Sequence, residues 1–243
     1  MSYLDMLTRL GVGSAHPGGF SATLHQLQQF PLPEGSRILE VGCGTGRTAC
    51  YLAKQGYTIT GLDIREEMLV KARARAEKEG LAISFVQGSI DALPFADGSF
   101  DVILAESVTN FADIRATLRE YSRVLSPGGA LYDREVMLLQ PMPEAEYEEI
   151  VRFFGFGGLL SDAEWPQALM AAGFARTETW NRSVFEEHLG EDQERNPDLL
   201  QVIDQGAILD SKVWRTSIEH DELIGRNRET LGYALFIAVK GES

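Results

Sequence analysis

The sequence predicts an α/β protein built on a mostly parallel β-sheet. Short apolar runs alternate with segments of helical period between residues 37 and 137, a pattern typical of strands joined by crossover helices. The run at residues 233–240 is almost wholly apolar, as expected for a strand covered on both faces. The length of 243 residues and the apolar content of 44% fit one globular domain.

Five strands and three helices are expected in the first part of this pattern. Gly56 and Gly80 end two of the helices, because glycine supplies the left-handed conformation of a helix stop. Asp113 is a suitable N-cap for the third helix, which ends at the turn of residues 126–129. The expected strands are 37–41, 57–62, 83–86, 100–105 and 130–137, and the first two helices are 45–55 and 65–79.

The pattern becomes less regular after residue 140. Pro141 and Pro143 open an acidic helix that the glycines at 155–158 interrupt. Ser161 and Glu164 have the spacing of a capping box. The later expected elements are a helix ending near Gly173, a strand at 174–180, a solvated acidic stretch at 186–194, a helix at 196–212 that begins with an Asn-Pro pair, and the strand at 233–240.

The N-terminal segment is predicted to hold one short helix. Leu24, Leu27 and Phe30 have helical spacing, and the prolines at 31 and 33 stop the helix. The preceding residues 16–20 are interpreted as a flexible loop because two glycines and a proline lie there. We expect His16 to be exposed to solvent in that loop.

Composition argues against several classes of protein. The formal net charge is −14, whereas binding to nucleic acid or to an anionic membrane depends on basic residues. No apolar run approaches the roughly 20 residues that span a bilayer, and no secretory signal is expected. Cys43 and Cys50 form no CxxC pair, and the four histidines lack zinc-ligand spacing. We therefore expect a cytoplasmic protein that binds no metal, nucleic acid or membrane.

The glycine-rich stretch at residues 40–46 is the clearest chemical signal in the chain. It follows an apolar strand and precedes a helix, so its glycines permit a tight turn and the close approach of a ligand. Asp63 ends the next strand about 20 residues after Gly42, the position from which an acid accepts hydrogen bonds from ribose hydroxyls. The alternative is that Asp63 is the N-cap of the following helix. Together the two features predict a nucleoside site at the carboxyl ends of adjacent strands.

Two residues argue against a nicotinamide dinucleotide at this site. Arg47 stands where the dinucleotide fingerprint requires its third glycine. Glu40 would repel a pyrophosphate, whereas a carboxylate beside the turn suits a cationic ligand. S-adenosylmethionine carries a sulfonium and an ammonium group, and it meets this requirement.

Four stretches resemble, in order, the motifs of class I S-adenosylmethionine-dependent methyltransferases. Residues 38–46 resemble the first motif and residues 61–64 the second. Residues 87–102 resemble the region of the third and fourth strands, and residues 125–129 resemble the turn before the fifth. The likeness is greatest to the small-molecule branch known as methyltransferase type 11.

The resemblance implies a doubly wound sheet of seven strands in the order 3-2-1-4-5-7-6, with strand 7 antiparallel. It divides the single domain into an N-terminal helical cap at 1–36, a cofactor-binding core at 37–140 and a C-terminal part at 141–243. An insertion at about 182–230 separates strands 6 and 7. We expect the N-terminal cap to cover the cofactor and the insertion to shape the acceptor pocket. Candidates for an apolar wall, each also explained by core packing, are Phe153, Phe154, Phe156 and Trp214.

The resemblance also implies roles for individual residues. The glycine turn faces the methionine part of the cofactor, and Asp63 takes the ribose hydroxyls. Relatives often carry Asp where Ser89 stands, so Asp91 is the expected substitute at the adenine edge. The expected cofactor-binding residues are Glu40, Gly42, Cys43, Gly44, Gly46, Asp63, Ile64, Met68, Ser89, Ile90, Asp91 and Glu106.

The expected reaction is transfer of a methyl group from S-adenosylmethionine to a small-molecule acceptor by in-line displacement. The leaving group is already cationic, so positioning and desolvation supply most of the catalysis. A general base is needed only for an acceptor that arrives protonated, and its weak candidates are Glu106, Asp113 and His16. Two alternatives stay open: a cofactor-binding protein whose catalysis is lost or secondary, and a methyltransferase that acts on protein or RNA.

Overall fold

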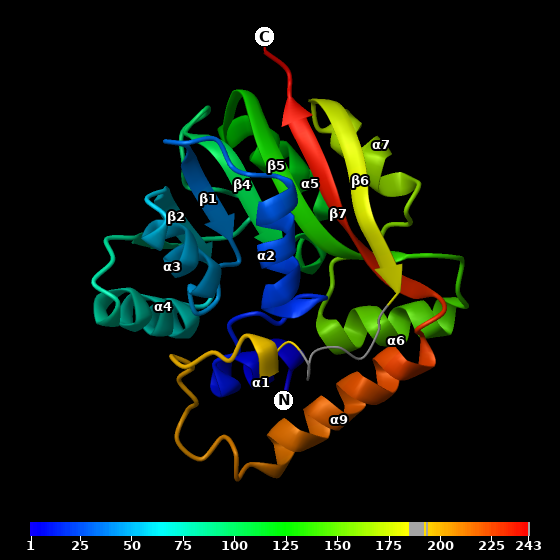
Figure 1. Cartoon of the computed structure of the whole chain (residues 1–243). Helices are drawn as coiled ribbons and strands as arrows, with labels where there is room; N and C mark the ends of the chain where they lie inside the picture. The colour runs from blue at the N-terminus through cyan, green and yellow to red at the C-terminus, as the bar shows by residue number, and fades with distance from the viewer. Residues whose placement is uncertain (185–191, 193, 243) are drawn as a thin grey trace.

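The computed structural model describes residues 1–184, 192 and 194–242 (Figure 1). Its centre is a seven-stranded sheet in the order β3-β2-β1-β4-β5-β7-β6. β7 runs antiparallel to β5 and β6, and the other pairs are parallel. The expected strand order and the antiparallel last strand are therefore confirmed. The strands are β1 Arg37–Val41, β2 Thr58–Asp63, β3 Ser84–Gln87, β4 Phe100–Glu106, β5 Leu125–Leu138, β6 Phe174–Val184 and β7 Leu231–Lys240.

Helices cover both faces of the sheet because buried apolar residues alternate along its central strands. Ile38 of β1 and Val102 of β4 belong to a cluster that includes residues of α3. Their neighbours Leu39 and Ile103 belong to a second cluster, which includes residues of α5 and α7. The doubly wound arrangement is thus confirmed. The covering helices are α2 Gly19–Gln29, α3 Arg47–Lys54, α4 Glu66–Lys78, α5 Ile114–Val124 and α7 Glu164–Ala171.

A third apolar cluster lies beyond the carboxyl ends of the parallel strands. It includes Tyr3 of α1 (Tyr3–Leu10) and Phe154 of α6 (Glu144–Phe154), together with residues of α9 (Ser211–Arg226). Figure 1 shows these three helices below the arrowheads of β1 and β4. We call the group of α1, α6 and α9 the cap. It differs from the N-terminal cap expected at residues 1–36, because it includes two helices from the later part of the chain.

The helix α1 is an addition to the sequence prediction, which places a single helix in the N-terminal segment. Ser2 and Asp5 form a capping box at its start, because the Asp5 amide donates to Ser2 Oγ and the Ser2 amide donates to the Asp5 carboxylate. The predicted second helix is confirmed, but α2 begins at Gly19. It therefore includes the last residues of the loop expected at 16–20.

The prediction of a helix at residues 196–212 is wrong. Residues 197–210, which we call the cap segment, are irregular, and α9 begins only at Ser211. Charged pairs hold the cap segment against α4, because Asp198 contacts Arg75 at 2.6 Å and Asp204 contacts Lys71 at 2.7 Å. These long-range contacts override the local helix-start signal of the Asn-Pro pair.

Two strand boundaries also differ from the prediction. The turn expected at 126–129 lies within β5, where Gly128 has a φ of 75° and the pairing with β4 shifts register after Phe100. β6 extends to Val184 rather than residue 180. Most of the solvated stretch expected at 186–194 lies outside the described residues.

The described helices include none that is both long enough and apolar enough to cross a membrane. The cytoplasmic location stays a prediction.

Candidate active site

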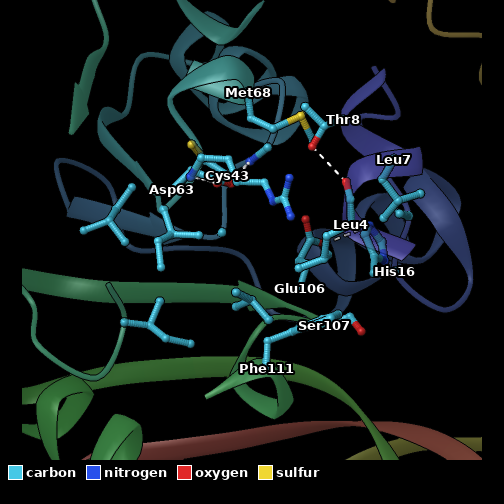
Figure 2. A pocket seen from close by; sticks show the side chains of 18 of the residues that line it. Leu4, Leu7, Thr8, His16, Cys43, Asp63, Met68, Glu106, Ser107 and Phe111 are labelled. Atoms are coloured by element: carbon cyan, nitrogen blue, oxygen red, sulfur yellow. Dashed lines mark hydrogen bonds and ion pairs between the residues drawn. The ribbon is translucent and has the colours of Figure 1, made fainter. Parts of the chain in front are cut away.

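A cavity of about 290 Å³ lies between the carboxyl ends of β1, β2 and β4 and the helix α1. We call it the strand-end cavity. Figure 2 shows Leu4, Leu7 and His16 on one side of it, and Cys43 and Asp63 on the opposite side. Carboxyl ends of parallel strands are the usual ligand position in open α/β sheets. The cavity therefore stands where the sequence predicts a nucleoside site.

The glycine turn has the backbone conformation that only glycine adopts easily. Gly42, Gly44 and Gly46 have φ angles of 62°, 52° and 71°. A Cβ atom at Gly42 would stand 2.5 Å from a methyl group of Val108. A Cβ atom at Gly44 would meet only the tip of Met68, at 3.5 Å, among the described residues. The backbone at Gly44 is therefore open to a ligand.

Asp63 ties the end of β2 to the glycine turn. Its Oδ2 accepts a hydrogen bond from the Gly44 amide at 2.9 Å, and its Oδ1 accepts one from the Arg65 amide at 2.9 Å. Burial raises the pKa of this carboxyl, and the amide donors oppose that rise. The N-cap of α4 is Arg65 rather than Asp63. The N-cap alternative for Asp63 is therefore wrong.

Glu40 is a buried carboxyl with a missing partner. Its side chain lines the strand-end cavity, and its Oε2 finds no hydrogen-bond partner within the described part of the chain. Burial raises its pKa well above the ordinary value, and the charge of Glu106 adds to the effect. A buried acceptor without a donor is costly. A cationic ligand with N–H groups would supply both the charge and the donor.

A buried polar chain links the N-terminal segment to the end of β4. Thr23 Oγ1 donates to Glu106 Oε1 at 2.5 Å, and Thr48 Oγ1 donates to Glu106 Oε2 at 2.9 Å. His16 Nε2 lies 3.2 Å from Thr23 Oγ1 and 3.5 Å from Glu106 Oε1. The expectation that His16 is exposed is wrong, because only 4% of it is accessible. Burial lowers the pKa of His16, and the Glu106 carboxylate opposes this.

Most of the expected cofactor-binding residues line the strand-end cavity. Gly46 is instead the N-cap of α3 and packs toward Ala72 and Phe85, and it is absent from the described lining. Asp91 is exposed and accepts a hydrogen bond from Ser89 Oγ, so it also stands apart from that lining. The expected residues that do line the cavity are Glu40, Gly42, Cys43, Gly44, Asp63, Ile64, Met68, Ser89, Ile90 and Glu106.

Asp113 is not brought to the cavity. It is exposed, and its carboxylate accepts a hydrogen bond from the Ala116 amide at the start of α5. This N-cap role explains the residue without any catalytic function. Of the three weak catalytic candidates, Glu106 and His16 line the cavity, whereas Asp113 is absent from the lining that the structure describes.

A second, larger cavity of about 1380 Å³ adjoins the first. We call it the cap cavity, because α1, α6 and α9 contribute to its walls. Phe111, Phe154 and Phe156 form an aromatic wall, with ring centroids 4.9 Å apart between Phe156 and each of the other two. The residues that line both cavities are Tyr3, Ala15, His16, Ser107 and Phe111.

Ser107 is a site residue that sequence reasoning missed. It follows β4, lines both cavities and has a φ of 58°, which is unusual for a residue other than glycine. Its amide donates to the Arg134 carbonyl at 2.7 Å, and this bond holds the backbone in place. Strained backbone of this kind clusters at functional sites. A serine gives no sequence signal for such a conformation. Tyr3 was missed because α1 was not predicted.

Comparison with known proteins identifies the family. The sequence profile described as "Methyltransferase domain" matches residues 39–133. A protein of Bacillus subtilis (strain 168) named "Uncharacterized methyltransferase YodH" is 38% identical over 98% of this chain and 99% of its own length. The chain belongs to the class I S-adenosylmethionine-dependent methyltransferases. The cofactor of this methyltransferase is S-adenosylmethionine.

One solved structure is similar to this chain in fold, and one further protein is similar to it in sequence. The structure of Haemonchus contortus phosphoethanolamine N-methyltransferase 2 in complex with phosphomonomethylethanolamine and S-adenosylhomocysteine has a TM-score of 0.79 and 22% identity, covering 98% of this chain and 56% of that chain. The methyltransferase therefore spans about half the length of that enzyme. The demethylmenaquinone methyltransferase of Thermus thermophilus is 37% identical over 51% of this chain and 60% of its own.

The strand-end cavity of the methyltransferase fits its cofactor. The unpartnered Glu40 Oε2 matches an ammonium group, and the open backbone at Gly44 admits a bulky ligand. The part of the chain described by the structure holds no group of three or more His, Cys, Asp or Glu side chains that is suited to a metal ion.

Proposed function

We propose that the methyltransferase transfers a methyl group from S-adenosylmethionine to a small-molecule acceptor bound in the cap cavity. The observation that carries this proposal is the wall that the two cavities share, which includes His16, Ser107 and Phe111. An acceptor in the cap cavity would meet the strand-end cavity at these residues. Direct contact between two bound reactants is the main requirement for a displacement at carbon.

We assign the cofactor to the strand-end cavity by the chemistry of its lining. Asp63 takes the ribose hydroxyls, and Glu40 faces the ammonium group of the methionine part. Ile64 and Met68 offer apolar contacts for the adenine, and Ser89 with Ile90 lines its edge. When bound, the cofactor supplies an electrophilic methyl group on a positively charged sulfur.

The protein contributes mainly alignment and the exclusion of water. Positive charge on the sulfonium disperses during methyl transfer, so a dry site favours the reaction. Leu4 and Leu7 of α1 close the strand-end cavity with apolar side chains. The formal charge of −14 and the apolar wall of the cap cavity favour a small organic acceptor over RNA.

Calorimetry and product release test the proposal together. We expect saturable binding of S-adenosylmethionine, and release of S-adenosylhomocysteine with at least one compound of a metabolite panel. Asp63→Ala should weaken cofactor binding by more than about tenfold, because hydrogen bonds to a charged group contribute roughly 1.5–3 kcal/mol. Gly44→Val should abolish binding, because its side chain enters the ligand's path.

Asp91→Ala is the matched control, since it removes a nearby exposed carboxylate that stands outside the described cavity lining. It should bind the cofactor as the unaltered protein does. Absence of saturable binding by well-folded protein would refute the cofactor assignment. Equal affinity of Asp63→Ala and the unaltered protein would remove Asp63 from the site.

A further inference from the structure

The loop that follows β4 forms one wall of the strand-end cavity. We call residues 107–112 the boundary loop, because Ser107 and Phe111 line both cavities. Val108 of this loop packs against the glycine turn, where a Cβ atom at Gly42 would stand 2.5 Å from a methyl group of Val108. A displacement of the boundary loop would therefore alter the proposed cofactor site and the wall that it shares with the cap cavity.

Two acidic side chains of β5 hold the boundary loop in place. Glu135 Oε1 accepts a hydrogen bond from the Thr109 amide at 2.6 Å, and Asp133 Oδ2 accepts one from Thr109 Oγ1 at 2.8 Å. Asp133 and Glu135 are two positions apart on one strand, so their side chains lie on the same face of the sheet. Arg134, between them, points to the opposite face and donates to the Ala22 carbonyl of α2. Thr109 is thus attached to both acids, by its backbone and by its side chain.

The two acids are buried with too few hydrogen-bond donors. Neither residue is accessible to solvent. One oxygen of each, Asp133 Oδ1 and Glu135 Oε2, finds no hydrogen-bond partner among the described residues. Two buried carboxylates that contact the same residue would repel one another, and burial makes that repulsion costly. The pair therefore keeps at least one proton near neutral pH, and the O–H group that this proton forms is a hydrogen-bond donor.

Burial dominates the ionisation of the pair. It raises the pKa of both acids, and the charge of Asp133 adds to the rise at Glu135. The hydroxyl of Thr109 opposes the rise at Asp133, and amides of the boundary loop oppose it at Glu135. Tyr121 of α5 faces the pair, and its hydroxyl lies 3.2 Å from Thr109 Oγ1. Burial raises the pKa of Tyr121 as well, so this hydroxyl is neutral.

The neighbouring strands and α7 contribute apolar or neutral residues around the pair. Asp133 lies opposite Ala105 of β4 and Phe236 of β7 in the sheet. Trp165 of α7 stacks on Phe236, with ring centroids 4.6 Å apart. Such neighbours do not compensate a second negative charge. Loss of the last proton of the pair at alkaline pH would therefore be opposed by repulsion between the two carboxylates.

We infer that Asp133 and Glu135 are positioning residues of the proposed methyl transfer, and that the proton they share keeps the boundary loop in place. They act through Thr109 on Ser107 and Phe111, two residues that line both cavities. This inference rests on the function proposed above. When both acids are ionised, movement of the boundary loop relieves their repulsion. The strand-end cavity then loses part of its wall, and affinity for the cofactor falls.

Carbon and nitrogen NMR of the unaltered protein tests the shared proton without any substitution. We expect the carboxyl carbons of Asp133 and Glu135 to show at least one proton on the pair at neutral pH. At alkaline pH the last proton should leave, and the Thr109 amide signal should move in the same step, because this amide donates to Glu135. Two ionised carboxyls at neutral pH, or a Thr109 signal that does not follow their ionisation, would overturn the inference.

Calorimetry with S-adenosylhomocysteine at increasing pH measures the consequence for the site. The affinity of the unaltered protein should fall at alkaline pH, by at most about tenfold per pH unit, as the pair loses its last proton. Glu135→Gln cannot ionise, and its amide keeps an acceptor oxygen for Thr109 and adds a donor. This variant should bind at neutral pH and should lack that part of the fall. Because the amino group of the ligand titrates in the same range, the variant also measures the contribution of the ligand alone.

Two further variants separate a positioning role from a structural one. Glu135→Ala removes the acceptor of the Thr109 amide, so hydrogen exchange at this amide should be faster and affinity at neutral pH lower, whereas Glu135→Gln should restore both. Asp113→Asn removes an exposed carboxyl beside the boundary loop and keeps an N-cap, so it should retain the alkaline fall. A merely structural pair would change the unfolding curves but leave the pH profile of affinity unaltered.

The outcomes separate this inference from the proposed function. Absence of saturable binding of S-adenosylhomocysteine by the folded, unaltered protein at neutral pH would refute the function itself. Saturable binding with the same pH profile in the unaltered protein and in Glu135→Gln would overturn the positioning role alone. If the Glu135 variants do not fold, the NMR titration of the unaltered protein decides.

Discussion

The sheet and the cap of the methyltransferase are held together by different kinds of interaction. In the sheet, neighbouring strands bury alternating apolar residues, as Leu39 and Ile38 do on opposite faces of β1. The three helices of the cap also share an apolar cluster. The cap segment, which precedes α9, is instead held against α4 by ion pairs such as that between Arg75 and Asp198. Apolar alternation is visible in local sequence, whereas ion pairs between distant residues are not. The proposed cofactor site therefore rests on the sheet, and the proposed acceptor site rests on the cap, which has more polar anchors.

The largest effect is expected in the sheet core. Leu118 of α5 is fully buried, and its truncation leaves a cavity, so Leu118→Ala should lower the free energy of unfolding by about 2–5 kcal/mol. Urea unfolding followed by circular dichroism measures this change. Val70→Ala is the control, since Val70 is 56% exposed on α4 and should change stability by less than about 0.5 kcal/mol. An equal decrease in the free energy of unfolding in the two variants would contradict the prediction that stability depends more on the sheet core than on the surface.

The division between sheet and cap also explains what the sequence predicts well. The glycine turn and the position of Asp63 were predictable because each depends on a short stretch and on an apolar strand beside it. The strand order was predictable only through the resemblance to the methyltransferase family. The cap segment was not, because its course depends on Arg75 and Lys71, more than 100 positions away along the chain for each partner. His16 was misjudged for the same reason. Its burial depends on Thr23 and Glu106, which sequence periodicity does not place beside it.

A smaller effect, confined to the cap, is expected at Lys71. Its Nζ donates to the Thr8 carbonyl at 2.7 Å, to the Val202 carbonyl at 2.9 Å and to Asp204 Oδ1 at 2.7 Å. Lys71→Met removes these donors and should ease opening of the cap by roughly 1–3 kcal/mol, because the buried Thr8 carbonyl would lose its donor. Hydrogen exchange should accelerate in α1 and the cap segment, while exchange in β1 and β4 stays slow.

Arg73→Met on the same helix is the matched control for Lys71→Met. Arg73 pairs with Glu66 on the surface, with 44% and 49% of the two side chains exposed. Such exposed pairs contribute little, so exchange in α1 should not change. Faster exchange throughout β1 and β4 in Lys71→Met would show that the cap and the sheet open as one unit, contrary to the comparison.

The smallest expected effect lies within the sheet region and concerns Glu40. Burial raises its pKa in the free protein, with Glu106 and Asp63 adding to the rise and Arg75 opposing it. A cationic cofactor favours the carboxylate, so the pKa is lower in the complex and binding releases a proton. Affinity for S-adenosylmethionine should therefore rise with pH, by at most about tenfold per pH unit, and should level off above the free-protein pKa.

Calorimetry between acid and neutral pH, in two buffers of different ionisation enthalpy, measures this proton release. Glu40→Gln keeps the shape of the side chain but cannot ionise, so its affinity should lose that pH dependence. Glu79→Gln is the control, because Glu79 pairs with Lys54 away from the cavity and its loss should leave the dependence intact. A slope unchanged in Glu40→Gln would show that Glu40 is not the source of the proton. Glu40 of β1 would then not hold the cationic end of the cofactor.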